Sequence, residues 1–199
     1  MVSPAAFIER VFDVPVFCQL NTRDYCKHKS GGSFVRSSFY SSPEDYQGDF
    51  LKYAQVADVL IAGAYWDPRA PVLFEREDIL KNNFKIRIIA DITCDIQGSI
   101  PSTLRSCTID EPIYDYNPSE DVVELPLTDE ANITVMAVDN LPCELSRNAS
   151  ESFGDELINN VLPYLIGKDT LGRIANATVA ERGRLSSKYD LLKDYVEGK

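Results

Sequence analysis

The sequence predicts an α/β fold: a doubly wound parallel sheet followed by a C-terminal helical appendage. Three apolar runs predict the strands of the sheet, namely DVLIAGAY (58–65), FKIRIIADIT (84–93) and ANITVMAVDN (131–140). Each run is continuously apolar rather than alternating, as expected of strands that are covered on both faces. Helical patterns alternate with the first two runs, and this spacing is typical of doubly wound proteins.

The N-terminal quarter predicts a short helix, a strand and a long loop. Ser3 and Pro4 precede an apolar stretch and predict an N-cap and a first-turn proline. The compact apolar run 14–20, VPVFCQL, predicts a strand. Residues 21–48 are polar and rich in Ser, Gly and Tyr, and a loop of that length indicates a lid or binding loop. Helix-like spacing over 49–57 then leads into the first strand of the sheet.

The middle of the chain predicts one further helix and a long excursion. EREDILKNN (75–83) has helical spacing and separates the first two strands of the sheet. Residues 98–130 are rich in proline and acidic groups, and we expect them to form a long excursion before the third strand.

The character of the chain changes after Pro142. A helix is predicted over SESFGDELINNVLPYL, with Ser150 or Ser152 as its cap, and a second amphipathic helix over 185–198. The sequence therefore predicts two parts, an α/β sheet domain over 1–141 and a helical segment over 142–199.

Composition excludes several classes of partner. The formal net charge is −11, from 20 Lys+Arg and 31 Asp+Glu, and no basic stripe is present, so neither nucleic acid nor an anionic membrane surface is an expected partner. No apolar stretch approaches the roughly 20 residues that span a bilayer. The N-terminus lacks a signal peptide pattern, and five scattered cysteines suit reduced thiols, so a cytoplasmic location is expected.

Metal-dependent and nucleophilic chemistry lack the residues that they need. His28 is the single histidine, and no CxxC pair accompanies it, so no metal site is predicted. Asp91, Cys94 and Asp95 lie close in sequence but lack a calcium-loop pattern. A cysteine nucleophile would have no nearby base, and no G-x-S-x-G elbow occurs. No catalytic residue is therefore predicted in this chain.

Polar tails follow all three strands of the predicted sheet: AGAYWDPRAP, ADITCDIQGS and AVDNLP. Any one of these tails is explained by ordinary turn chemistry. Three together indicate a shared cleft, since ligands of open parallel sheets bind beyond the carboxyl ends of the strands. The glycine-rich G-x-G-x-x-G and Walker A patterns are absent from the sequence. Either the chain is not a dinucleotide binder, or its first βα unit is missing.

Those tails carry a family resemblance. The stretches IADITCDIQGSIPSTLRSCTIDEPIYDYNP and VMAVDNLPCELSRNASESFGDEL resemble the lysine-forming saccharopine dehydrogenase and lysine–2-oxoglutarate reductase family, relatives of alanine dehydrogenase and the transhydrogenase α subunit. The resemblance runs over nearly the whole chain. It implies that residues 1–141 are an incomplete NAD(P)-binding domain, a Rossmann-like sheet lacking its first βα unit, with NAD or NADP as cofactor. It also implies that the glycine loop and the acid/base domain lie outside these residues, so that Met1 starts a truncated, incomplete or split product.

The resemblance also assigns site residues. Asp95 is expected near the nicotinamide ribose and the reacting centre, Asn140 would face the nicotinamide with Asp139 beside it, and the Tyr65-Trp66 stretch would complete the cofactor site. Arg147 matches the arginine of the family's L-P-R-x-A-S phrase and is expected to bind substrate. Ser146 stands here where that phrase has proline.

Three functional hypotheses follow. In the first, the chain is the cofactor-binding portion of an oxidoreductase that forms or cleaves saccharopine from lysine and 2-oxoglutarate, inactive in isolation and homodimeric. In the second, it is a non-catalytic dimerisation or regulatory module derived from that family. The third is an alanine dehydrogenase-like oxidoreductase, which fits the VDNLP and R-x-A-S-x-x-F blocks less well.

Overall fold

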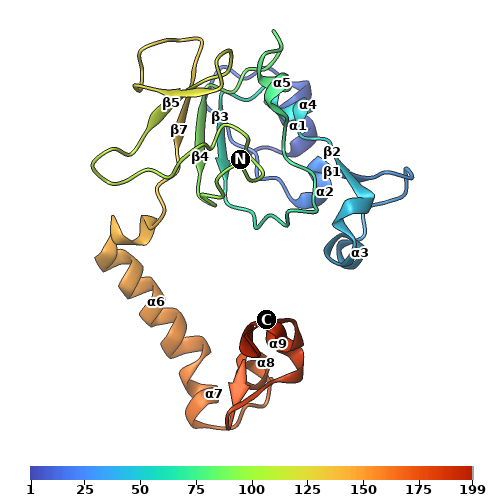
Figure 1. Ribbon diagram of the computed structural model, residues 1–199, viewed down its shortest axis with the longest axis vertical. Helices are drawn as coiled ribbons and strands as arrows, with labels where there is room; N and C mark the ends of the chain where they lie inside the picture. Colours follow the sequence, from blue (N-terminus) through green and yellow to red (C-terminus); the bar gives the residue numbers. More distant parts are fainter. Residues whose placement is uncertain (199) are drawn as a thin grey trace. The chain divides into compact units, whose positions relative to one another are not determined.

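The structure is a computed structural model that describes residues 1–198. The chain divides into two compact units, Met1–Leu141 and the residues from Pro142 onward (Figure 1). The functional roles expected for 1–141 and 142–199 stay predictions.

A five-stranded mixed sheet forms the centre of the first unit, in the order β3-β4-β7-β5-β6 (Figure 1). Its strands are β3 (Val59–Ala62), β4 (Ile88–Asp91), β7 (Ile133–Met136), β5 (Tyr114–Asn117) and β6 (Val122–Glu124). β3, β4 and β7 pair in parallel, whereas β5 and β6 extend the sheet in antiparallel fashion. The three parallel strands lie inside the three predicted apolar runs, which confirms the predicted α/β class.

One face of the parallel strands carries the hydrophobic core. Leu60, Ile89 and Val135 share one register position across β3, β4 and β7, and the last two are fully buried. The core also contains Phe50, Phe74 and residues of two short helices, α4 (Leu51–Ala54) and α5 (Arg76–Ile79). Burying one such aliphatic side chain stabilises the fold by about 1.5–3 kcal/mol, so this face holds the unit together.

The opposite face of β3 and β4 is open, and the expectation that both faces are covered is wrong there. Val59, Ile61 and Ile88 are 50%, 72% and 49% exposed. Successive side chains of a strand point to opposite faces, and the residues from 1 to 198 cover only one of them at this end of the sheet.

The excursion over 98–130 contains structure that the sequence analysis missed. β5 and β6 form an antiparallel hairpin within it, and β5 also pairs with β7. Tyr114 and Tyr116 are fully buried, while Asp115 between them accepts hydrogen bonds from Thr134 Oγ1 and Leu127 N at 2.8 and 2.9 Å. A charged residue in the middle of a strand hides the strand pattern, because its burial depends on partners from distant segments.

The predicted strand over 14–20 is wrong. These residues form no strand, and the side chains of Val14 and Phe17 are exposed. The helix before them is confirmed: α1 (Pro4–Glu9) has proline in its first turn, and Ser3 Oγ accepts a hydrogen bond from Ala6 N at 3.3 Å.

Residues 21–48, expected to form a loop, instead form a small folded region that we call the hairpin lobe. Strands β1 (Cys26–His28) and β2 (Tyr46–Gly48) pair antiparallel in it. Its helices are α2 (Thr22–Tyr25), α3 (Arg36–Ser41) and η1 (Pro43–Asp45). The buried Tyr46 ring contacts the rings of His28, Phe34 and Phe39. This aromatic cluster gives the lobe its own small core, which a reading based on polar composition misses.

The second unit consists mainly of helices. They are α6 (Ser146–Asn160), α7 (Leu162–Ile166), α8 (Arg173–Ala177), η3 (Ser187–Leu192) and α9 (Lys193–Val196), together with the small hairpin β8 (Ala180–Glu181) and β9 (Arg184–Leu185). Two details of the prediction are wrong. α6 begins at Ser146, after Leu145, rather than at the predicted serine caps. The helix expected over 185–198 is broken at Tyr189, whose backbone is not helical. None of the helices in residues 1–198 is both long and apolar enough to cross a membrane.

Candidate functional site

Three loops leave the sheet at one edge, which we call the carboxyl edge. Ala62 at the end of β3 lies opposite Asp91 at the end of β4, and Ile92 N donates to Ala62 O at 2.8 Å. Beyond β7, Ala137 O accepts from Cys107 N at 2.7 Å. The segments after β3, β4 and β7 therefore start side by side, as predicted for the three polar tails.

Asp91 anchors the loop that follows β4. Its side chain accepts hydrogen bonds from Thr93 N at 3.1 Å, from Thr93 Oγ1 at 2.6 Å and from Thr103 Oγ1 at 2.7 Å. The residue is only 1% exposed. A buried carboxylate is stable when its oxygens are hydrogen-bonded, and these three bonds tie both ends of the loop 92–103 to β4.

The backbone of this loop is unusually tight. Cys94 and Gln97 have positive φ values of 52° and 53°, a conformation that non-glycine residues adopt only when their surroundings enforce it. Gln97 N donates to Thr103 O at 2.9 Å, and Gly98 N donates to Asp95 O at 2.8 Å. A Cβ on Gly98 would lie 2.5 Å from Asp95 Cβ, so glycine is required there. Asp95 is thus presented to solvent by a rigid loop.

The surroundings of Cys94 raise the pKa of its thiol. Burial raises the pKa of its thiol to about 11, and the Asp91, Asp139 and Asp95 carboxylates add to the effect. A raised pKa keeps a thiol protonated at neutral pH and lowers its reactivity as a nucleophile. Asp95 and Asp139 stand on the segments that follow β4 and β7, at the same edge of the sheet.

Asp139 and Asn140 lie just beyond β7, after Ala137 and Val138. Ala137 and Val138 are buried, whereas Asp139 and Asn140 are exposed. The segment after β7 therefore places two polar side chains at the carboxyl edge, as the sequence predicts.

Tyr65 and Trp66 lie on the third loop, which follows β3. Tyr65 is 89% exposed, while Trp66 is partly buried and its Nε1 donates to Ala70 O at 3.3 Å. A turn at Asp67 shapes this loop, since Ala70 N donates to Asp67 O at 2.7 Å. The Tyr65 ring is free to contact a ligand.

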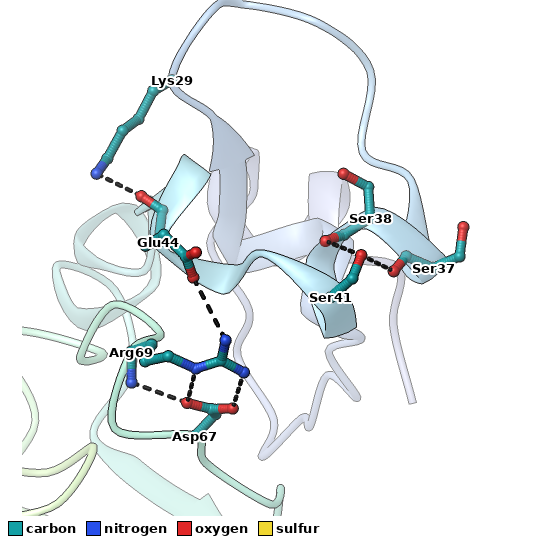
Figure 2. A network of polar contacts seen from close by, with 7 residues as sticks. All are labelled: Lys29, Ser37, Ser38, Ser41, Glu44, Asp67 and Arg69. Carbon is teal, nitrogen blue, oxygen red and sulfur yellow. Dashed lines mark hydrogen bonds and ion pairs between the residues drawn. The ribbon is translucent and has the colours of Figure 1, made fainter.

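The hairpin lobe supports this third loop (Figure 2). Arg69 donates two side-chain hydrogen bonds to the Asp67 carboxylate, at 3.1 and 2.8 Å, and lies 3.8 Å from Glu44 Oε2 of the lobe. The guanidinium holds the pKa of Asp67 below its ordinary value. A Cβ on Gly48 would lie 3.1 Å from Val72 O, so the lobe approaches the loop backbone closely.

The same loop also contacts the loop that carries Asp95. Leu73 N donates to Ser99 O at 2.9 Å. The first unit thus brings Asp95, Asp139, Asn140, Tyr65 and Trp66 to loops of one edge. Arg147 is not among them: it lies in α6 of the second unit, its side chain is 88% exposed, and it pairs with Glu151 at 3.0 Å.

The sequence analysis treated Asp91 only as a strand residue and overlooked Thr103, Gly98 and the Asp67–Arg69 pair. In the D-P-R sequence an arginine follows an aspartate by two residues. This spacing could have predicted the turn at Asp67. The Asp91–Thr103 contact spans twelve positions and has no local signal. Among residues 1–198, no group of three or more His, Cys, Asp or Glu side chains could hold a metal ion.

Comparison with known proteins identifies related sequences. No protein-family model matches the chain. The chain is 32% identical over 192 residues, 92% of its length, to alpha-aminoadipic semialdehyde synthase of Arabidopsis thaliana. It is 24% and 25% identical over 206 residues, 90% of its length, to the mitochondrial alpha-aminoadipic semialdehyde synthases of Mus musculus and Bos taurus. The chain spans 18% of the plant relative and 22% of each mammalian one.

The match covers almost all of this chain and includes the strand tails on which the predicted resemblance rests. The central sheet is of the mixed, mostly parallel α/β kind that the resemblance implies. Over the segment that it shares with these relatives, the chain is therefore similar to the alpha-aminoadipic semialdehyde synthases, which confirms the resemblance to the lysine–2-oxoglutarate reductase and saccharopine dehydrogenase family predicted from its motifs.

Proposed function

We propose that this chain is the nicotinamide-side portion of an oxidoreductase that forms or cleaves saccharopine. The observation that carries the proposal is the convergence of three strand tails at the carboxyl edge, with Asp95 exposed on a rigid loop. Open parallel sheets bind ligands at this edge. The name of the relatives describes an enzyme that makes the semialdehyde of aminoadipic acid, which fits an oxidoreductase.

The residues at the carboxyl edge fit one half of a dinucleotide. Asp95, Asn140 and Asp139 offer acceptors and a donor for ribose hydroxyls and a carboxamide, and the exposed Tyr65 and the neighbouring Trp66 offer aromatic surface. A bound NAD or NADP would supply the hydride chemistry. The sequence has no glycine-rich phosphate loop, so we propose that residues outside this chain bind the pyrophosphate.

The substrate side rests on Arg147. Within residues 1–198 its guanidinium pairs with an exposed glutamate on the same helix, an interaction of small energy that an incoming carboxylate can replace. Lysine, 2-oxoglutarate and saccharopine all carry carboxylates. We place Arg147 in substrate binding and assign no acid/base residue to this chain, so the chain alone is expected to be inactive.

Titration of NADH and NADPH into the 199-residue chain, followed by nicotinamide fluorescence, tests the cofactor assignment. We expect saturable binding that Asp95→Ala weakens by about tenfold, the effect of losing roughly 1.4 kcal/mol of contact energy. Glu120→Ala is the matched control, because Glu120 is an exposed carboxylate in the turn between β5 and β6, at the other end of the sheet.

Three outcomes would contradict the proposal. Equal binding by the Asp95 and Glu120 variants, or no saturable binding of either dinucleotide, would remove the cofactor assignment. Lysine-dependent oxidation of NADH or NADPH by the chain alone would contradict the expected inactivity.

A non-catalytic dimerisation or regulatory module is the second candidate. The missing phosphate loop and the open apolar face of β3 and β4 favour it. The dinucleotide titration separates the two, since both candidates allow a dimer and only the module predicts a dimer without dinucleotide binding. The homodimer and the cytoplasmic location stay proposals. The names of the mammalian relatives place those proteins in mitochondria, and cell fractionation would decide between mitochondria and cytoplasm for this chain. The alanine dehydrogenase-like alternative has no support from the relatives described above.

A further inference from the structure

Asp91 lies at the carboxyl edge, and the proposed function does not use its carboxylate. It is a carboxylate at the end of β4, 1% exposed, and the ion pairs found among residues 1–198 do not include it. Keeping a charge there without a cation requires strong hydrogen bonds. The three hydrogen bonds that its carboxylate accepts are donated by Thr93 and Thr103, at the two ends of the loop 92–103 that carries Asp95.

The bonds divide between the two carboxylate oxygens. Oδ1 accepts from the backbone and hydroxyl of Thr93, just before the strained Cys94, and Oδ2 accepts from the hydroxyl of Thr103. Thr103 in turn receives Gln97 N on its carbonyl oxygen. The Asp91 carboxylate thus links Thr93 to Thr103. Cys94 and Gln97, the two residues with positive φ, lie between these linked residues.

We propose that Asp91 is a positioning residue: it clamps Thr93 to Thr103 and so fixes the direction in which Asp95 faces the cofactor. The functional part of this statement rests on the proposed role of Asp95, whereas the clamp itself is a property of the loop. Charge-assisted hydrogen bonds are about twice as strong as neutral ones. A carboxylate can therefore sustain two left-handed residues that would otherwise relax.

Asp115 provides an internal comparison. It is also a 1% exposed carboxylate, and it also accepts a threonine hydroxyl, that of Thr134 at 2.8 Å, and a backbone N–H, that of Leu127. Its partners lie on β7 and in the segment after β6, outside the loop 92–103. A purely structural role for Asp91 predicts that the two sites respond alike.

The experiment compares Thr103→Val with Thr134→Val in the full 199-residue chain. Each replacement keeps the shape of the side chain and removes one hydroxyl that donates to a buried aspartate. Hydrogen exchange of the Gln97 and Gly98 amides is measured by NMR, and NADH binding by fluorescence. We expect Thr103→Val to speed exchange at both amides by about tenfold more than Thr134→Val does, since a net hydrogen bond to a charged group is worth about a factor of ten or more. Thr103→Ser should restore protection.

The exchange result decides the clamp whether or not NADH binds. Equal exchange in the two valine variants, or failure of serine to restore protection, would overturn it. If the wild-type chain binds no NADH, the cofactor assignment fails while the exchange comparison still stands. If NADH binds, Thr103→Val should weaken it and Thr134→Val should not, and equal affinities would overturn the positioning role.

Discussion

The two units of this chain differ in how far their apolar side chains are buried. In residues 1–141 the sheet, α4 and α5 enclose a continuous core, and many of its side chains are fully buried. Between residues 142 and 198 no residue is buried, and Phe153, Ile158 and Leu165 are more than half exposed. The first unit buries one face of its sheet in this core, while the other face of β3 and β4 is open. The second unit exposes its apolar side chains, which is the pattern of an element that packs against another surface.

The largest expected effect tests the core of the first unit. Ile89 is fully buried at the centre of β4, so Ile89→Ala removes buried methylene groups and leaves a cavity. We expect a loss of about 2–5 kcal/mol in the free energy of unfolding, measured by urea denaturation with tryptophan fluorescence from Trp66. Ile158→Ala in α6, the same change at an exposed position, should alter that free energy by less than about 0.5 kcal/mol. Comparable losses would erase the distinction between the units.

The sequence predicts most of this difference, and the exceptions have physical causes. The parallel strands are found from their apolar runs because burial there is decided locally. β1, β2 and β5 were missed because Tyr46 and Asp115 are buried through partners distant in the chain. The three polar tails were located because each follows an apolar run, whereas the cofactor roles that the resemblance assigns to their residues stay predictions.

The support beneath those site residues could not be predicted in the same way. The clamp at Asp91 depends on Thr103, and the turn at Arg69 on Glu44, contacts that only the folded chain creates. The position of Arg147 relative to the carboxyl edge likewise depends on packing between elements, which sequence patterns do not encode.

A second, intermediate effect concerns pH and sharpens the description of the first unit. Burial acts to raise the pKa of Asp78, but the Lys81 ammonium at 2.5 Å and the Glu75 N–H outweigh it and lower that pKa below its ordinary value. A carboxyl with a lowered pKa in the folded state contributes stability above its unfolded pKa, near 4, and loses it as pH falls through the folded pKa.

The unfolding free energy should therefore fall between pH 5 and pH 3, and Asp78→Asn should flatten that fall by about 1 kcal/mol, the usual worth of a helix cap. Urea midpoints at both pH values measure it. Asp155→Asn in α6, an exposed carboxyl of the second unit, is the control and should leave the pH dependence unchanged. An unchanged slope in the Asp78 variant would show that the α5 cap does not carry this pH dependence.

The smallest effect on stability is expected where the second unit is most apolar. Phe153 is 70% exposed on α6, so Phe153→Ser gives up little burial within the chain and should change the free energy of unfolding by less than about 0.5 kcal/mol. If copies of the chain cover this face in solution, the same change should shift sedimentation toward the monomer, because an exposed aromatic residue is a common anchor of an interface. Glu156→Ser, a polar exposed position one turn along the helix, should leave both quantities unchanged. A large loss of stability in the Phe153 variant would instead mean that the second unit has a core of its own, and the contrast between the two units would disappear.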